Sequence, residues 1–177
     1  MLVADKLRGS NISEYIIHMY KTEDLLRTYE FNLEQMNEYV ISHLPVEKEE
    51  KEEISKWYQA IALRMKSEGK QESGHLVELD QLVASLSAMS ELLLKEDKEY
   101  QKIYKSARPS IDEALKFADG KITNEIQICL NGIYGLLLLR TRGKSVADEL
   151  MKSLNAYGDV LSYLSYKYNQ QKVMSKN

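Results

Sequence analysis

The segment from Ile126 to Leu139 restricts the fold of this chain more than any other. It is a run of apolar side chains and glycines in which only Gln127 and Asn131 are strongly polar. A membrane-spanning helix needs about 20 apolar residues, so this segment is too short to cross a bilayer. At 100° per residue its apolar side chains cover every face of a helix, and such a helix must be surrounded by protein. We therefore predict a buried central helix over about residues 123–141.

The glycines of this segment lie inside the helical pattern. A phosphate-binding loop places its glycines before a helix and follows them with lysine and serine or threonine. The loop from Gly69 to Gly74 has the glycine spacing but continues with His75, so it also fails as a phosphate loop. Gly132 and Gly135 each cost about 1 kcal/mol in helix propensity. We therefore expect neighbouring backbone to approach the helix closely at these two positions.

The remainder of the chain also predicts helices and no strands. The 177 residues include 8 glycines and only 2 prolines, and apolar residues recur with helical spacing. Asn11 with Glu14, Asn32 with Gln35, and Ser110 with Glu113 have the spacing of helix-capping pairs. Pro109 is expected to break one helix just before the third pair. The predicted fold is a single all-α domain, residues 1–177, of about six to seven helices around the central helix, with the first ten and last seven residues frayed.

Charge and cysteine content narrow the classes of function. The formal net charge of −3 provides no dense basic face, so we predict no nucleic-acid partner. The single cysteine excludes an internal disulfide. The N-terminal residues carry charges and lack the apolar core of a secretory signal. We therefore expect a cytoplasmic protein with no membrane partner.

Two charged residues fall on predicted apolar faces. Glu23 projects into the apolar stripe of its helix, and Arg140 extends the apolar face of the central helix. Burying an unpaired charge costs several kcal/mol, so each needs a partner. In one interpretation, Glu23 forms a structural ion pair with Arg27 or with Arg140. In the other, Glu23 and Arg140 line a polar pocket together with Asn131.

No metal-binding or catalytic motif is present in the sequence. His18, His43 and His75 are too far apart in the chain to form a two-histidine helix face, and no Glu-x-x-His motif occurs. Cys129 lies in the predicted core, where a thiol is usually inert. The sequence therefore predicts no cofactor and no metal, and it favours a non-enzymatic protein. We expect His75 to brace the start of its helix, although a metal site with Glu23 stays an alternative.

Tyrosines are concentrated near the C-terminus. Tyr157, Tyr163, Tyr166 and Tyr168 occur in the last predicted helix, on more than one face. Tyrosine joins an apolar ring to a polar hydroxyl and is enriched at protein interfaces. The four residues either form the rim of the core or dock a second copy of the chain.

Several segments resemble a known family. They are NISEYIIHMYKTEDLLR, the Trp57–Tyr58 pair, the Gly74–Leu76 tripeptide and NGIYGLLLLR. Together they are similar to an uncharacterised bacterial all-helical family classified only as a domain of unknown function. The resemblance implies one helical domain with no known activity, and it transfers no catalytic residues. It draws attention to Glu23, Asp24, Arg27, His75, Tyr134 and Arg140.

Two functions follow from these observations. The first is a non-enzymatic binding module that associates with itself as a homodimer, or with another protein. The alternative is a bundle that binds a small molecule or a metal, and its activity could extend to catalysis. Its polar pocket would be lined by Glu23, Arg27, His75, Asn131, Tyr134 and Arg140.

Overall fold

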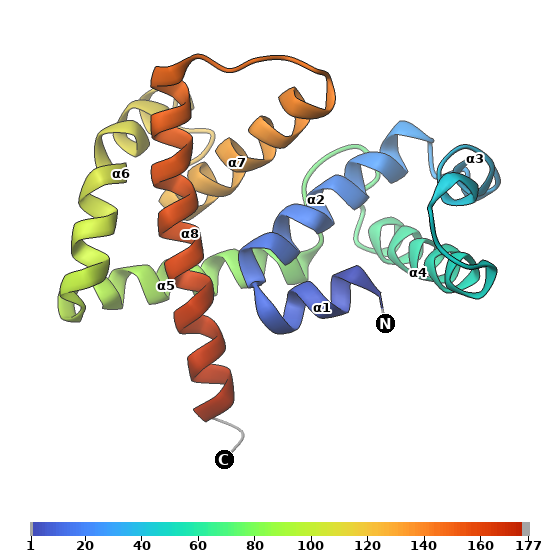
Figure 1. Cartoon of the computed structure of the whole chain (residues 1–177), viewed down its shortest axis with the longest axis horizontal. Helices are drawn as coiled ribbons and strands as arrows, with labels where there is room; N and C mark the ends of the chain where they lie inside the picture. The colour runs from blue at the N-terminus through green and yellow to red at the C-terminus, as the bar shows by residue number, and fades with distance from the viewer. Residues whose placement is uncertain (1, 175–177) are drawn as a thin grey trace.

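The computed structural model describes residues 2–174, and all regular structure within that range is helical (Figure 1). The all-α prediction is therefore confirmed, although the eight α-helices exceed the six to seven expected. The elements are α1 (Val3–Ser10), α2 (Ile12–Thr28), α3 (Leu33–Tyr39), the 3-10 helix η1 (Ile41–His43), α4 (Lys48–Ser67), α5 (Val77–Glu96), α6 (Lys98–Phe117), α7 (Glu125–Thr141) and α8 (Asp148–Met174). None of these helices is both long and apolar enough to cross a membrane.

Helix α2 connects the two ends of the molecule. It contacts α4 on one side and both α7 and α8 on the other. Figure 1 shows α3 and α4 at one end of the molecule and α6 and α8 at the other, with α2 between them. Residues of α2 such as Ile12, Ile16 and Leu26 are fully buried, so this helix belongs to the core along most of its length.

Capping residues set the start of two helices as predicted. The Asn11 side chain accepts a hydrogen bond from the Glu14 backbone N–H (3.2 Å) and donates one to the Glu14 carboxylate (2.9 Å). Asn32 accepts from the Gln35 N–H at 3.1 Å. The ends of the chain differ from expectation, because residues 3–10 form α1, which packs on α2 and buries Ala4. Helix α8 continues to Met174, and residues 175–177 lie outside the described residues.

The predicted break at Pro109 is wrong, because α6 is one helix that continues through the proline. Proline removes one backbone donor from the helical ladder, and in Figure 1 the helix changes direction in its later half. Ser110 does not cap a new helix. Its hydroxyl donates to Ser153 Oγ (2.8 Å), and its carbonyl accepts from the Tyr157 hydroxyl (2.8 Å). Contacts with α8 therefore hold the turn that the proline weakens.

Helix α7 is more deeply buried in its first half, although Glu125 and Gln127 there are only partly buried. Ile126, Cys129 and Leu130 are at most 2% exposed. In the second half Leu136 is buried, whereas the side chains of Ile133, Leu137, Leu138 and Leu139 are only partly buried. The prediction of a fully surrounded central helix is therefore wrong for the C-terminal half, where the structure leaves part of the helix at the surface.

The two glycines of α7 have different surroundings. A Cβ atom added at Gly132 would lie 2.7 Å from Cδ2 of Tyr157, so α8 approaches the helix closely there. At Gly135 no atom lies within 4 Å of an added Cβ. The close approach at Gly132 therefore comes from the Tyr157 side chain and not from the neighbouring backbone that was expected, and Gly135 has no such contact.

Candidate functional site

Glu23 is a fully buried carboxylate on α2, and it finds its partners in the segment before α5. Its Oε2 atom lies 2.6 Å from Nδ1 of His75, and its Oε1 atom accepts the backbone N–H of Leu76 at 2.9 Å. A buried carboxylate is tolerated when such bonds replace its hydration. The interpretation of Glu23 as a structural partner therefore has support, but the partner is His75 and not Arg27 or Arg140.

These contacts also complete the start of α5. The first N–H groups of a helix have no partner within the helix, and the N-cap residue Leu76 offers no side-chain acceptor. The Glu23 carboxylate accepts the N–H of Leu76, and Glu68 Oε2 accepts the N–H of Val77 at 2.7 Å. Negative charge at a helix N-terminus is favourable because it opposes the positive end of the helix dipole.

His75 is fixed by an aromatic neighbour as well as by the carboxylate. Its ring stacks on Tyr20 with centroids 3.7 Å apart and an interplanar angle of 17°. Tyr20 is buried, and its hydroxyl bonds to the Gln127 side chain of α7. Burial raises the pKa of Tyr20 to about 12, although the Gln127 hydrogen bond lowers it in part. The imidazole is therefore held against α2 by two of its residues, the Glu23 carboxylate and Tyr20, whose hydroxyl stays protonated at neutral pH.

Arg27 and Asp24 tie the same loop to α2 and α7. Arg27 Nη1 donates to Asp24 Oδ1 (2.9 Å), and Nη2 donates to the backbone carbonyls of Lys70 (3.1 Å) and Gly74. The other oxygen of Asp24 accepts the Tyr134 hydroxyl at 2.6 Å. Burial, together with this hydrogen bond to Asp24, raises the pKa of Tyr134 well above its usual value. The loop that precedes α5 is thus bonded to α2, and Asp24 links Arg27 to α7.

Five of the six predicted pocket residues belong to this polar network. Asn131 joins it because its Oδ1 accepts from Gln127, which bonds to Tyr20 in turn. We define the polar network as Tyr20, Glu23, Asp24, Arg27, His75, Gln127, Asn131 and Tyr134. The sequence did not single out Tyr20 or Gln127, because both are spaced like ordinary core-edge residues and only the packing of α2 on α7 brings them together.

Arg140 lies apart from the polar network. It is exposed near the end of α7, and no ion pair between it and Glu23 is present in residues 2–174. The helical wheel placed Arg140 on the buried face because it assumed that α7 was surrounded along its whole length. The structure exposes that end of the helix, so the guanidinium reaches solvent.

The polar network is bonded internally. Glu23 and Asp24 each accept hydrogen bonds from two protein groups. Five surface grooves, with volumes between about 290 and 650 Å³, are all lined by residues other than Glu23 and His75.

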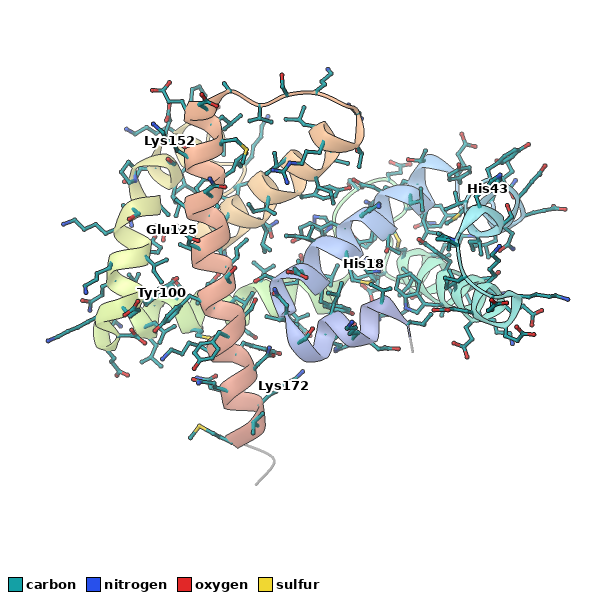
Figure 2. The ribbon with its side chains drawn as sticks, in the orientation of Figure 1. His18, His43, Tyr100, Glu125, Lys152 and Lys172 are labelled. Atoms are coloured by element: carbon teal, nitrogen blue, oxygen red, sulfur yellow. The ribbon has the colours of Figure 1, made fainter. Side chains whose placement is uncertain are left out.

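Within the described range, no three His, Cys, Asp or Glu side chains come close enough to hold a metal ion. Figure 2 shows His18 and His43 well apart, on α2 and beside α3. What the polar network can do is hold the loop before α5 in a fixed position against α2.

The tyrosines of α8 have different surroundings from one another. Tyr157 is 5% exposed and its hydroxyl bonds within the core, so it offers no outer surface. Tyr163 donates to Asp97 (2.9 Å), which also pairs with Lys167. Tyr166 is 57% exposed, and Tyr168 is partly buried. Of the four predicted interface residues, only Tyr166 exposes most of its side chain.

A groove between α2 and α7 combines apolar and charged side chains. It has a volume of about 350 Å³. We call it the α2–α7 groove; its apolar residues are Leu7, Ile17, Ile133, Leu136 and Leu137, and its polar residues are Glu14, His18, Lys21 and Arg140. Sequence reasoning missed this groove because it treated the whole of α7 as buried.

Comparison with known proteins places the chain in a family. The chain belongs to the family described as Domain of unknown function (DUF4924), whose model matches residues 1–175. The match confirms the resemblance found in the sequence, and the family's description states neither an organism nor an activity. No curated protein and no solved structure matches the chain.

Proposed function

We propose that this protein is a non-enzymatic helical binding module that associates with itself as a homodimer. The α2–α7 groove carries the proposal, because its walls leave Ile133 and Leu137 of α7 only partly covered. When a partner buries exposed apolar surface, the free energy of the complex falls by about 25 cal/mol per Å² of surface removed from water. A helical protein that presents such a surface gains stability from docking.

The interior of the protein favours binding over catalysis. The carboxylates of Glu23 and Asp24 are held by neighbouring side chains and backbone, so a substrate would have to displace those bonds. Burial raises the pKa of Cys129 to about 12, which keeps the thiol protonated and a poor nucleophile at neutral pH. Both observations support a protein that works through its surface.

Native mass spectrometry of freshly purified protein, without chelator, tests the proposal. We expect a species at twice the chain mass of 20.5 kDa with no additional mass, and light scattering over a dilution series should show it dissociating. A monomer at every concentration would contradict self-association. Additional mass that is lost on denaturation would instead favour the small-molecule or metal-binding alternative at the polar network.

A further inference from the structure

We infer that the second copy docks across the α2–α7 groove about a two-fold axis, with Glu14 of each copy against Arg140 of the other. This inference rests on the proposed self-association and specifies its surface and its register. Three observations carry it: the direction of the two helices, the positions of their charges, and the apolar surface that continues from the groove onto α4.

The two helices run in the same direction. Tyr20 of α2 bonds to Gln127 of α7, and farther along both helices Asp24 bonds to Tyr134. Figure 1 shows α2 and α7 rising side by side along the same diagonal. Glu14 lies toward the N-terminal end of α2, and Arg140 lies near the C-terminal end of α7. The acidic and basic side chains are therefore at diagonally opposite ends of the groove.

A two-fold axis that lies in the plane of the contact, perpendicular to the line from Glu14 to Arg140, exchanges these two positions. In an isologous dimer, residue i of one copy contacts residue j of the other, and j contacts i. The Glu14 carboxylate would then face Arg140 twice, once at each end of the contact. Opposite charges placed in this way fix the register of two copies and disfavour other alignments.

The charges of the groove are available for this pairing. In residues 2–174, neither Glu14 nor Arg140 forms an ion pair within its own chain, and the Glu14 carboxylate bonds only to the capping amide of Asn11. Burial, reinforced by nearby Lys21, holds the pKa of His18 below its usual value. The His18 ring is therefore neutral at neutral pH and does not compete for Glu14.

Aromatic side chains extend the apolar surface beyond the groove. Trp57 of α4 stacks against His18, with ring centroids 5.8 Å apart, and meets Tyr58 edge-on at 5.0 Å. Both aromatic residues are partly exposed, and Val3 of α1 is 61% exposed. Since a stable dimer buries about 800 Å² on each partner, the groove alone would be small. Tryptophan and tyrosine beside it are residue types that supply much of the binding energy at interfaces.

A charge-swap experiment tests the register. Glu14→Lys and Arg140→Glu each place like charges together at both ends of the two-fold contact. We expect each variant alone to dimerise at least about 10-fold more weakly than the unchanged protein. In a one-to-one mixture, the two substituted side chains would face each other as opposite charges at one end of the contact. At the other end, the unchanged Glu14 of one variant would face the unchanged Arg140 of the other. The mixture should therefore recover a heterodimer with an affinity close to that of the unchanged protein.

The controls reverse exposed charges elsewhere. Glu52→Lys on α4 and Lys152→Glu on α8, whose lysine is labelled in Figure 2, should leave the dimerisation constant unchanged. Native mass spectrometry distinguishes the heterodimer by mass, and recovery on mixing itself shows that both variants are folded. If every variant dimerises normally, the inferred surface is wrong while self-association stands. If both variants are weakened but mixing does not restore the dimer, the two-fold pairing is wrong. If the unchanged protein is monomeric throughout, the proposed function fails.

Discussion

The polar network and the α2–α7 groove are both built by helices α2 and α7, yet their chemistry is opposite. In the polar network, the carboxylates of Glu23 and Asp24 each accept two hydrogen bonds from protein groups, and Glu23 is fully buried, although Arg27 Nε is buried without a hydrogen-bond partner within residues 2–174. In the groove, Glu14 and Arg140 form no ion pair within residues 2–174, and four of the five apolar side chains are only partly buried. We infer from this comparison that the polar network stabilises the fold, and we propose that the groove side binds a partner.

Removing the Glu23 side chain should have the largest effect. Glu23→Ala leaves His75 and the Leu76 N–H without their acceptor, and we expect the free energy of unfolding to fall by about 3 kcal/mol. Urea unfolding monitored by circular dichroism measures it. The matched control is Glu91→Ala on the exposed side of α5, which should change stability by about 0.5 kcal/mol or less. Equal effects of the two substitutions on the free energy of unfolding would show that the polar network does not stabilise the fold.

A charge in the groove should affect association more than stability. Leu137→Glu places a carboxylate on the apolar wall, and we expect dimerisation to weaken by at least about 10-fold. Because Leu137 is only partly buried, the unfolding of the monomer should change little. Analytical ultracentrifugation measures the association, and urea unfolding of the diluted protein measures the stability.

The exposed tyrosine of α8 provides the matched comparison for that variant. Tyr166→Ser should leave association unchanged if the copies meet at the groove. The tyrosine surface expected from the sequence stays a prediction that this variant tests. Dissociation by Tyr166→Ser, with no effect of Leu137→Glu, would move the interface to α8.

Alanine substitutions at the two glycines of α7 should distinguish its packed side from its open side. Their effects on the free energy of unfolding should be smaller than that of Glu23→Ala. Gly132→Ala places a methyl group 2.7 Å from the buried Tyr157 ring, so we expect a loss of about 1–2 kcal/mol in the free energy of unfolding. Gly135→Ala meets no atom within 4 Å and should gain up to about 1 kcal/mol from helix propensity. Thermal unfolding compares the two variants. Effects of the same sign would contradict the difference between the two sides.

The smallest expected effect is a loss of stability in acid that depends on Asp97, which pairs with Lys167 of α8 and lies in neither the polar network nor the α2–α7 groove. The Lys167 ammonium, with the Tyr100 N–H and the Tyr163 hydroxyl, holds the pKa of Asp97 far below its usual value. A depressed carboxyl pKa contributes stability that is complete above the unfolded-state pKa of about 3.9 and is lost as pH falls below it. Asp97→Asn should therefore destabilise the protein slightly at pH 7, with the difference shrinking toward pH 2. A difference that is constant across this range would show that the Asp97 charge is not responsible.

Local signals in the sequence predicted most of the helices but not the contacts between them. The capping pairs at Asn11 and Asn32 depend on residues three apart, so spacing was sufficient. The bond between Glu23 and His75 joins residues 52 apart, and only the path of the loop brings them together. The same limit hid the groove, because helical spacing shows that α7 is apolar on all sides but not where its neighbours end.

Hydrogen–deuterium exchange over a dilution series tests the difference between the two regions most directly. Amides in residues 133–140 of α7 and 14–21 of α2 should exchange faster as dilution dissociates the dimer. Amides in residues 70–77, held by the polar network, should exchange at the same rate at every concentration. Concentration-independent exchange in the groove, or faster exchange at residues 70–77 on dilution, would contradict the assignment of one region to the fold and the other to a second copy.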